Sequence, residues 1–137
     1  MKKLVLLTLF LLTLVSCSID DDQPNYSYEV LPVDSYTLPA SFTLGQTYEI
    51  KLKYKRPTKC HFYQGIYYDK NLNIRTIGIQ TSVLQNTDCE PIDLELTEVS
   101  FKFYVTNTGS YIFKFYKGED ANGENIFEEV EVPVVIN

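Results

Sequence analysis

The sequence predicts an all-β protein, an antiparallel β-sandwich of about seven strands. Apolar and polar residues alternate with a period of two from Tyr26 onward, which is the spacing of strands with one buried face. Turn-forming residues recur about every ten positions, and no stretch has the apolar spacing of a helix. The roughly 120 residues behind the N-terminal segment suffice for one domain with one core. A small closed barrel is the alternative architecture.

The clearest strand is predicted over residues 47–55. Its apolar and charged residues fall on opposite faces, with Tyr48, Ile50, Leu52 and Tyr54 on one and Glu49, Lys51, Lys53 and Lys55 on the other. This alternation predicts one face in the core and one in water. The preceding segment, residues 26–30, also alternates, but Pro32 and Pro39 restrict it to a sheet edge or a broken strand.

Further along the chain, irregular features mark the boundaries of strands. Gly65 interrupts an aromatic-rich segment, residues 60–68, which predicts a β-bulge or a close backbone approach. Residues 74–83 return as a strand. Between residues 92 and 105 the apolar face switches from even to odd positions, which a bulge or two short strands would explain. Asn122-Gly123 predicts a hairpin before the last strand.

The first seventeen residues predict export and lipid attachment. Lys2 and Lys3 precede an apolar run over residues 4–15, and Leu14-Val15-Ser16-Cys17 places a small residue before a cysteine. This order resembles the lipobox of bacterial lipoproteins, in which the cysteine is acylated and becomes the first residue of the mature protein. The run is shorter than the roughly 20 residues that cross a bilayer. Residues 1–16 are therefore expected to be a removed signal and Cys17 the membrane anchor; a cleaved signal without a lipid is the alternative.

A polar tether, residues 17–25, is predicted to follow, and it contains Asp20-Asp21-Asp22. Three adjacent carboxylates stay hydrated and resist packing. The run also resembles the acidic segment behind the lipidated cysteine in surface lipoproteins of Bacteroidota. That resemblance implies a lipid-anchored protein of the outer membrane that faces the exterior, with a periplasm-facing orientation as the alternative.

The charge balance argues against a nucleic-acid partner. The chain has 12 basic and 18 acidic residues, and loss of residues 1–16 would leave a formal net charge of −8. Nucleic-acid binding requires a basic surface, whereas an acidic one favours solubility. The membrane is expected as a partner only through the lipid.

Cys60 and Cys89 are the cysteines that remain after Cys17. In an oxidising compartment such a pair usually forms a disulfide. The bond would close a loop of about 30 residues and stabilise the fold by roughly 3.5 kcal/mol on a chain-entropy estimate. Two free thiols and a metal pair are the alternatives; a metal is disfavoured because His61 is the only histidine. No metal site and no cofactor are expected.

The segment Asn107-Thr108-Gly109-Ser110-Tyr111-Ile112-Phe113 resembles a turn-and-strand motif of immunoglobulin-like domains. In that motif a tyrosine forms a corner, and its hydroxyl bonds to upstream backbone. Tyr111 matches this tyrosine, whereas Phe113 replaces the family's second cysteine, and the chain has no tryptophan. A plain turn before a β-rich strand is the alternative. With the lipobox and the acidic run, the motif makes the chain similar to small immunoglobulin-like surface lipoproteins of Bacteroidota with no assigned activity.

The residues do not predict an enzyme. A nucleophile–histidine–acid triad would have to use His61, and the adjacent Cys60 would point to the opposite face of a strand. Two acidic-amide segments, residues 69–73 and 120–124, resemble calcium loops but lack the required ligand spacing. Hairpin turns explain both.

Aromatic residues are the most informative class for binding. Eleven tyrosines and eight phenylalanines exceed the needs of a small core. Four tyrosines lie off the predicted inward pattern and are the candidates for a binding face: Tyr63, Tyr68, Tyr104 and Tyr116. Exposed aromatic faces bind sugars and proteins, although tyrosine also has a high strand propensity. The sequence thus predicts a binding or accessory module for an unknown protein or glycan. A structural subunit of an envelope complex is the alternative, and a small hydrolase a remote one.

Overall fold

The computed structural model describes residues 23–85, 87–92 and 95–137. These residues form ten strands and no helix, so the predicted all-β sandwich is confirmed. Within these ranges no helix is long and apolar enough to span a membrane. The predicted signal, Cys17 and the acidic run lie outside the described residues.

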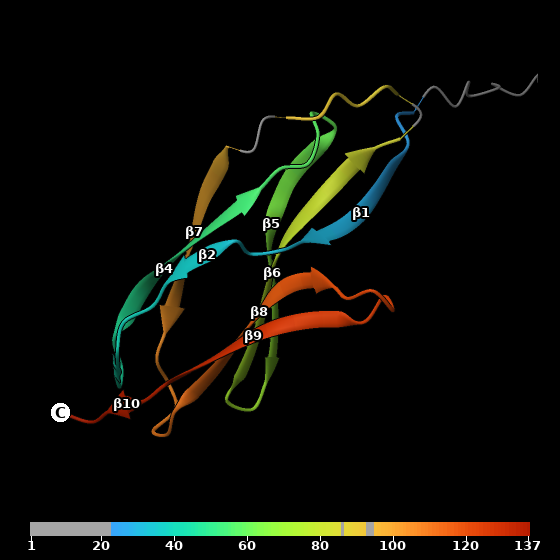
Figure 1. The fold of residues 1–137 in the computed structure, drawn as a ribbon. Coiled ribbons are helices and arrows are strands. Elements are labelled where there is room, and N and C mark those ends of the chain that lie inside the picture. Colours follow the sequence, from blue (N-terminus) through green and yellow to red (C-terminus); the bar gives the residue numbers. More distant parts are fainter. Residues whose placement is uncertain (1–22, 86, 93–94) are drawn as a thin grey trace, which may run out of the picture.

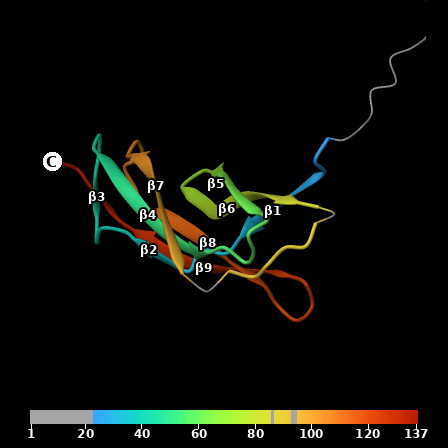
Figure 2. The same ribbon diagram turned by 90° about the horizontal axis from the view of Figure 1, so that it is seen from above.

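Two sheets form the layers of the sandwich. The five-stranded sheet contains β1 (Tyr26–Leu31), β5 (His61–Asn71), β6 (Ile74–Leu84), β8 (Tyr111–Glu119) and β9 (Asn125–Val132). The three-stranded sheet contains β2 (Ser35–Thr37), β4 (Thr47–Lys55) and β7 (Leu96–Tyr104), and the short strands β3 (Phe42–Thr43) and β10 (Val134–Val135) pair with each other. Figures 1 and 2 show β4 and β7 on one side and β1, β5 and β6 on the other. The first described residues and the C-terminus lie at opposite ends of the molecule.

The core follows the period-two pattern of the strands. In β4, Ile50, Leu52 and Tyr54 are buried, while the lysines between them are exposed. Phe42, Phe103 and Phe113 meet at the centre, with ring centroids 5.1 to 5.9 Å apart. Burial of one such side chain contributes about 1.5–3 kcal/mol. The alternating segments therefore form one core between the two sheets.

Strand β6 changes its neighbour along its length. Its residues 79–84 pair with β1 in antiparallel fashion, and its residues 74–77 pair with β8 in parallel, while β5 occupies its other edge. The pair β3–β10 is parallel as well. The sequence did not predict these two parallel pairs, because alternation reports which face is buried and not the direction of the partner. Gly78 lies where β1 and β8 diverge from β6.

Most predicted irregularities are present. A register shift between Tyr63 and Gly65 confirms the bulge in β5, and Gly123 (φ 80°) turns the hairpin between β8 and β9. A second bulge at Gly118 was not predicted. Strand β7 begins at Leu96, so residues 92–105 are not one continuous strand; residues 93–94 lie outside the described ranges.

Candidate functional site

The four candidate tyrosines do not share one face, and this part of the prediction is wrong. The bulge at Gly65 places Tyr63 and Tyr68 opposite Thr81 and Ile77, on the core side of β5. There Tyr63 stacks on Tyr54, with ring centroids 6.3 Å apart. Tyr104 lies on β7 beside Tyr68, and Tyr116 lies on the opposite face of the five-stranded sheet. Only Tyr116 belongs to the aromatic surface that the sheet presents.

That surface is the outer aromatic face of the five-stranded sheet. It is formed by side chains on β1, β5, β8 and β9 that point away from the three-stranded sheet: Tyr26, Tyr28, Phe62, Tyr67, Tyr116 and Phe127. Aromatic rings pack in pairs at both ends of this face. The ring centroids of Tyr26 and Phe62 are 6.4 Å apart, and those of Tyr116 and Phe127 are 5.9 Å apart. No other strand of the described chain covers this face. The sequence missed the set because Tyr26, Tyr28 and Tyr67 resemble ordinary strand residues.

A cavity of about 450 Å³ lies on this face as an open groove. Its walls are Tyr67, Tyr116 and Phe127, and Thr76 and Asn125 supply polar groups. Tyr67 pairs with Gly78 across β5 and β6, and a Cβ on Gly78 would lie 3.6 Å from Tyr116 Cβ. Val30, which lines the groove, occupies the space that a Gly78 side chain would need, so the glycine lets β1 pack closely over β6 between the aromatic walls.

A second hollow lies further along the same face. It has a volume of about 390 Å³ and is lined by Tyr26, Tyr28, Phe62, Gln64 and Ser82. Tyr28 and Phe62 both pair with Ser82, from opposite edges of β6. Ser82 is buried and accepts a hydrogen bond of 2.8 Å from Gln64 Nε2. The face thus offers two hollows in a row, which suits an extended ligand.

The groove has an acidic rim. Glu29 and Glu119 line it, and both carboxylates act on Tyr116. Burial is the largest cause of the raised pKa of Tyr116, and the charges of Glu119 and Glu29 raise it further. The phenol is therefore neutral near pH 7 and can donate a hydrogen bond into the groove.

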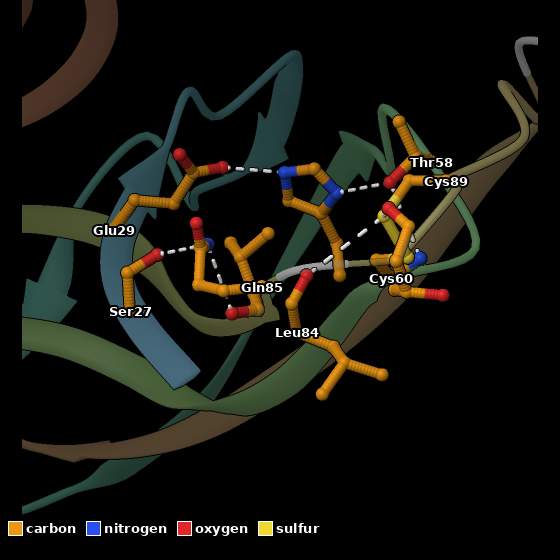
Figure 3. The surroundings of a disulfide bond; sticks show 10 residues. Ser27, Glu29, Thr58, Cys60, Leu84, Gln85 and Cys89 are labelled. Carbon is orange, nitrogen blue, oxygen red and sulfur yellow. Dashed lines mark hydrogen bonds and ion pairs between the residues drawn. A yellow bond between two sulfur atoms is a disulfide. The ribbon is translucent and has the colours of Figure 1, made fainter. Parts of the chain in front are cut away.

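The disulfide predicted between Cys60 and Cys89 is present, with the two Cα atoms 5.5 Å apart (Figure 3). Backbone hydrogen bonds beside it join Lys59 N to Glu90 O and Leu84 N to Cys60 O. The bond therefore fastens the segment after β6 to the turn before β5.

His61 has a structural set of contacts beside this disulfide. It is 8% exposed, its Nε2 lies 2.6 Å from Glu29 Oε1, and its Nδ1 lies 2.8 Å from Thr58 Oγ1 (Figure 3). The order of acid, histidine and hydroxyl resembles a triad. However, Thr58 Oγ1 also accepts the Cys60 N–H, and His61 does not line the groove. These contacts link β1, β5 and the Thr58 turn across β6.

Tyr111 makes the contacts of a tyrosine corner. Its fully buried side chain accepts hydrogen bonds from the backbone N–H groups of Thr106 (3.0 Å) and Asn107 (2.9 Å). Burial raises the pKa of Tyr111, but the hydrogen bond with the Thr106 side chain, the two backbone hydrogen bonds and the charge of Arg75 outweigh this effect, so the pKa is lowered. The corner anchors the turn before β8 and belongs to the scaffold rather than to the groove.

The two segments that resemble calcium loops are hairpin turns. Asp120 Oδ1 accepts hydrogen bonds from the backbone of Asn122 and Glu124, so this carboxylate is occupied by its own turn. Residues 69–73 close the β5–β6 hairpin, where Asn71 pairs with Ile74. In the described part of the chain, no three His, Cys, Asp or Glu residues gather as metal ligands.

Comparisons with protein-family models, with curated proteins and with solved structures found no match to this chain.

Proposed function

We propose that the protein is a lipid-anchored binding module of the outer membrane, that it faces the exterior, and that its outer aromatic face binds a neutral glycan. One observation carries the binding proposal: six aromatic side chains and two hollows lie along one sheet face that no other described strand covers. Exposed apolar patches of this kind mark interaction sites.

The chemistry of the groove supports a sugar as the ligand. Aromatic rings stack on the apolar faces of sugar rings, while Thr76, Asn125 and the Tyr116 hydroxyl can bond to hydroxyl groups. The Glu119 carboxylate can accept hydrogen bonds from hydroxyls, whereas Glu29 Oε1 already lies 2.6 Å from His61 Nε2. Both carboxylates repel an acidic polymer. These features favour a neutral chain that extends over both hollows.

The proposed location at the outer membrane is inferred mainly from the sequence around Cys17. The lipobox and the acidic run support a lipid anchor with outward display. The Cys60–Cys89 bond supports an exported protein, because disulfides persist in oxidising compartments. The contacts of Tyr111 support an immunoglobulin-like body, although the parallel β6–β8 pair departs from an all-antiparallel sandwich.

Two experiments test the location. Cells that express the wild type are expected to incorporate an alkyne-labelled palmitate into the protein, and cells that express Cys17→Ala are not. Protease shaving of intact cells should then remove the wild-type domain. A wild type that takes up no label, or that resists shaving while an external control protein is cut, would contradict the anchor or the outward orientation, respectively.

Affinity electrophoresis tests the ligand. The folded body lies within residues 23–137, so a chain that begins at Ser18 can be used without its lipid. We expect gels that contain a neutral polysaccharide, such as a β-glucan, a mannan or a xylan, to retard this chain relative to polysaccharide-free gels. Equal mobility in all these gels would contradict a neutral glycan as the ligand, and retention by a protein partner alone would favour protein recognition instead.

A structural subunit of an envelope complex is the second candidate. Among the described strands, β5 has 11 residues and β7 has 9, and each pairs along one edge only. Uncovered strand edges of this length can accept another strand. Native electrophoresis of solubilised outer membranes would favour this function if the protein ran in a larger complex that did not require the outer aromatic face.

A further inference from the structure

A second cleft lies at the open edge between the two sheets, and we call it the edge cleft. It has a volume of about 390 Å³ and lies between the end of the β5–β6 hairpin and β7. Its lining includes Tyr68, Lys70, Arg75, Phe101, Lys102 and Tyr104. The rings of Tyr68 and Phe101 meet across the gap with centroids 5.9 Å apart, so side chains of both sheets form one site.

The edge cleft is lined by basic residues, although the protein as a whole has a negative net charge. Three cationic side chains line it, and no carboxylate does. Every other lysine of the described residues pairs with a carboxylate, whereas Lys70 and Lys102 form no ion pair there. Glu49 lies opposite Lys102 in the β4–β7 register, but its carboxylate accepts the Ser100 hydroxyl at 2.8 Å. A hydroxyl does not neutralise this carboxylate, so Glu49 offsets part of the charge of Lys102. None of the three cations of the cleft forms an ion pair within the described residues.

Arg75 places a cation at the inner end of the cleft. It is 2% exposed, and its Nη1 donates to the carbonyl oxygens of Leu72 and Ile74 at 2.8 Å each. Its Nε has no hydrogen-bond partner in the described residues, and no carboxylate pairs with it there. The guanidinium also lies over the Tyr111 ring, with Cζ 4.9 Å from the ring centroid. Burial of a charge without an opposite charge beside it is unfavourable, so an anion near this guanidinium would be stabilised.

The walls of the cleft suit a ring. Tyr68 and Tyr104 are exposed, and Phe101 is partly buried, so the flat apolar surfaces of these rings are accessible from solvent. Tyr68 and Arg75 line the same cleft. Burial raises the pKa of Tyr68, and the charge of Arg75 opposes part of this rise. A ligand can thus stack its ring on the tyrosines while its charged group reaches the cations.

We infer that the edge cleft binds a small anionic ring compound, a sugar that carries a carboxylate or a phosphate. The site differs from the outer aromatic face in position and in sign of charge, and it does not depend on the function proposed for that face. Lys70 and Lys102 supply attraction from the rim, Arg75 supplies the buried charge, and Tyr68 and Tyr104 hold the ring.

Titration of the chain from Ser18, followed by amide chemical shifts, tests this inference. The probes are glucuronate and glucose 6-phosphate, with glucose as the ring without charge and inorganic phosphate as the charge without a ring. At least one acidic sugar is expected to shift amides of Tyr68, Lys102 and Tyr104 saturably at concentrations on the order of 10 mM or below. Glucose and inorganic phosphate should bind more weakly, and salt should weaken binding of the acidic sugar.

A variant with reversed charges at Lys70 and Lys102, compared with a charge reversal outside the cleft, tests the role of the cations. Lys70→Glu/Lys102→Glu is expected to lower the affinity about tenfold or more, because it replaces two attractive charges with repulsive ones. Arg75 is left unchanged, since it also holds the hairpin carbonyls. Lys59→Glu, on a side chain that is 64% exposed and lies outside the cleft, is the control and should retain wild-type affinity. The inference is overturned if neither acidic sugar binds saturably, if glucose or phosphate binds equally well, or if the double variant binds like the control.

Discussion

Gly78 and Val30 are packed so closely that a Cβ on Gly78 would lie 2.4 Å from Val30 Cγ1. Val30 belongs to β1 and lines the groove of the outer aromatic face, and Gly78 lies beneath it on β6. A β-branched side chain cannot easily move from such a contact. The floor of the groove therefore depends on a glycine at this position.

Gly78→Ala is expected to lower the free energy of unfolding by about 1–3 kcal/mol, the usual cost of overpacking. Val30→Ala should recover part of this loss in the double variant, because it removes the atom that the new Cβ meets. Urea unfolding of the four proteins of this mutant cycle measures the coupling. Strictly additive losses would show that the two residues do not clash.

The Tyr111 hydroxyl should contribute measurably to stability. Tyr111→Phe removes the acceptor of two backbone N–H groups, at Thr106 and Asn107, and is expected to cost about 1–3 kcal/mol. Tyr104→Phe is the control, since Tyr104 is exposed and no hydrogen bond of its hydroxyl is present in the described residues. Equal unfolding midpoints for the two variants would contradict the role of the corner.

Leu72 is expected to be a site where substitution stabilises the protein. Its φ is 55°, a left-handed conformation that disfavours leucine, and its side chain is 83% exposed at the β5–β6 turn. Asparagine tolerates this conformation, so Leu72→Asn should raise stability by about 0.5–1 kcal/mol. Thermal unfolding measures the change. A lower midpoint than that of the wild type would refute the argument from the backbone.

Acid should weaken the contact between β2 and β9. The Tyr36 hydroxyl donates to Glu128 Oε1 at 2.7 Å, and Lys117 Nζ lies 2.9 Å from Glu128 Oε2. The hydrogen bonds from Tyr36 and Lys117 lower the pKa of Glu128 below its ordinary 4.5. A lowered pKa means that the stabilisation is complete above pH 4.5 and is lost as the pH falls through the folded-state value.

The wild type should therefore lose stability more steeply than Glu128→Gln as the pH falls below 4.5. At alkaline pH the stability contributed by Tyr36 falls as the pH rises, since burial and the hydrogen bond to Glu128 raise the pKa of Tyr36 to about 12. Its contribution should persist below pH 10 and disappear as the pH approaches 12, and Tyr36→Phe should lack this step. Parallel stability–pH curves for wild type and variants would contradict the network.

Local patterns predicted much of this fold. The alternation in residues 47–55 placed the β4 core residues correctly, the two cysteines predicted the disulfide, and Asn122-Gly123 predicted the β8–β9 hairpin. Each of these features depends on residues close in sequence or on a chemistry with few alternatives.

The candidate site was harder to predict, because it depends on pairings between distant segments. The bulge at Gly65 was expected, but its effect on Tyr63 and Tyr68 depends on the register with β6. The groove exists because β1 and β8 diverge from β6 at Gly78, and period-two alternation contains no information on that divergence. The outer aromatic face thus became visible only from the strand order.

The most direct test of the proposed function is whether glycan binding requires the outer aromatic face. Tyr67→Ala/Phe127→Ala removes two walls of the groove, and Tyr104→Ala removes an exposed tyrosine outside it. Loss of one stacked ring typically costs about 1 kcal/mol. The mobility of the double variant in the polysaccharide gel that retards the wild type should therefore approach its value without polysaccharide, while Tyr104→Ala stays retarded. Equal retardation of the wild type and the double variant would contradict binding at this face.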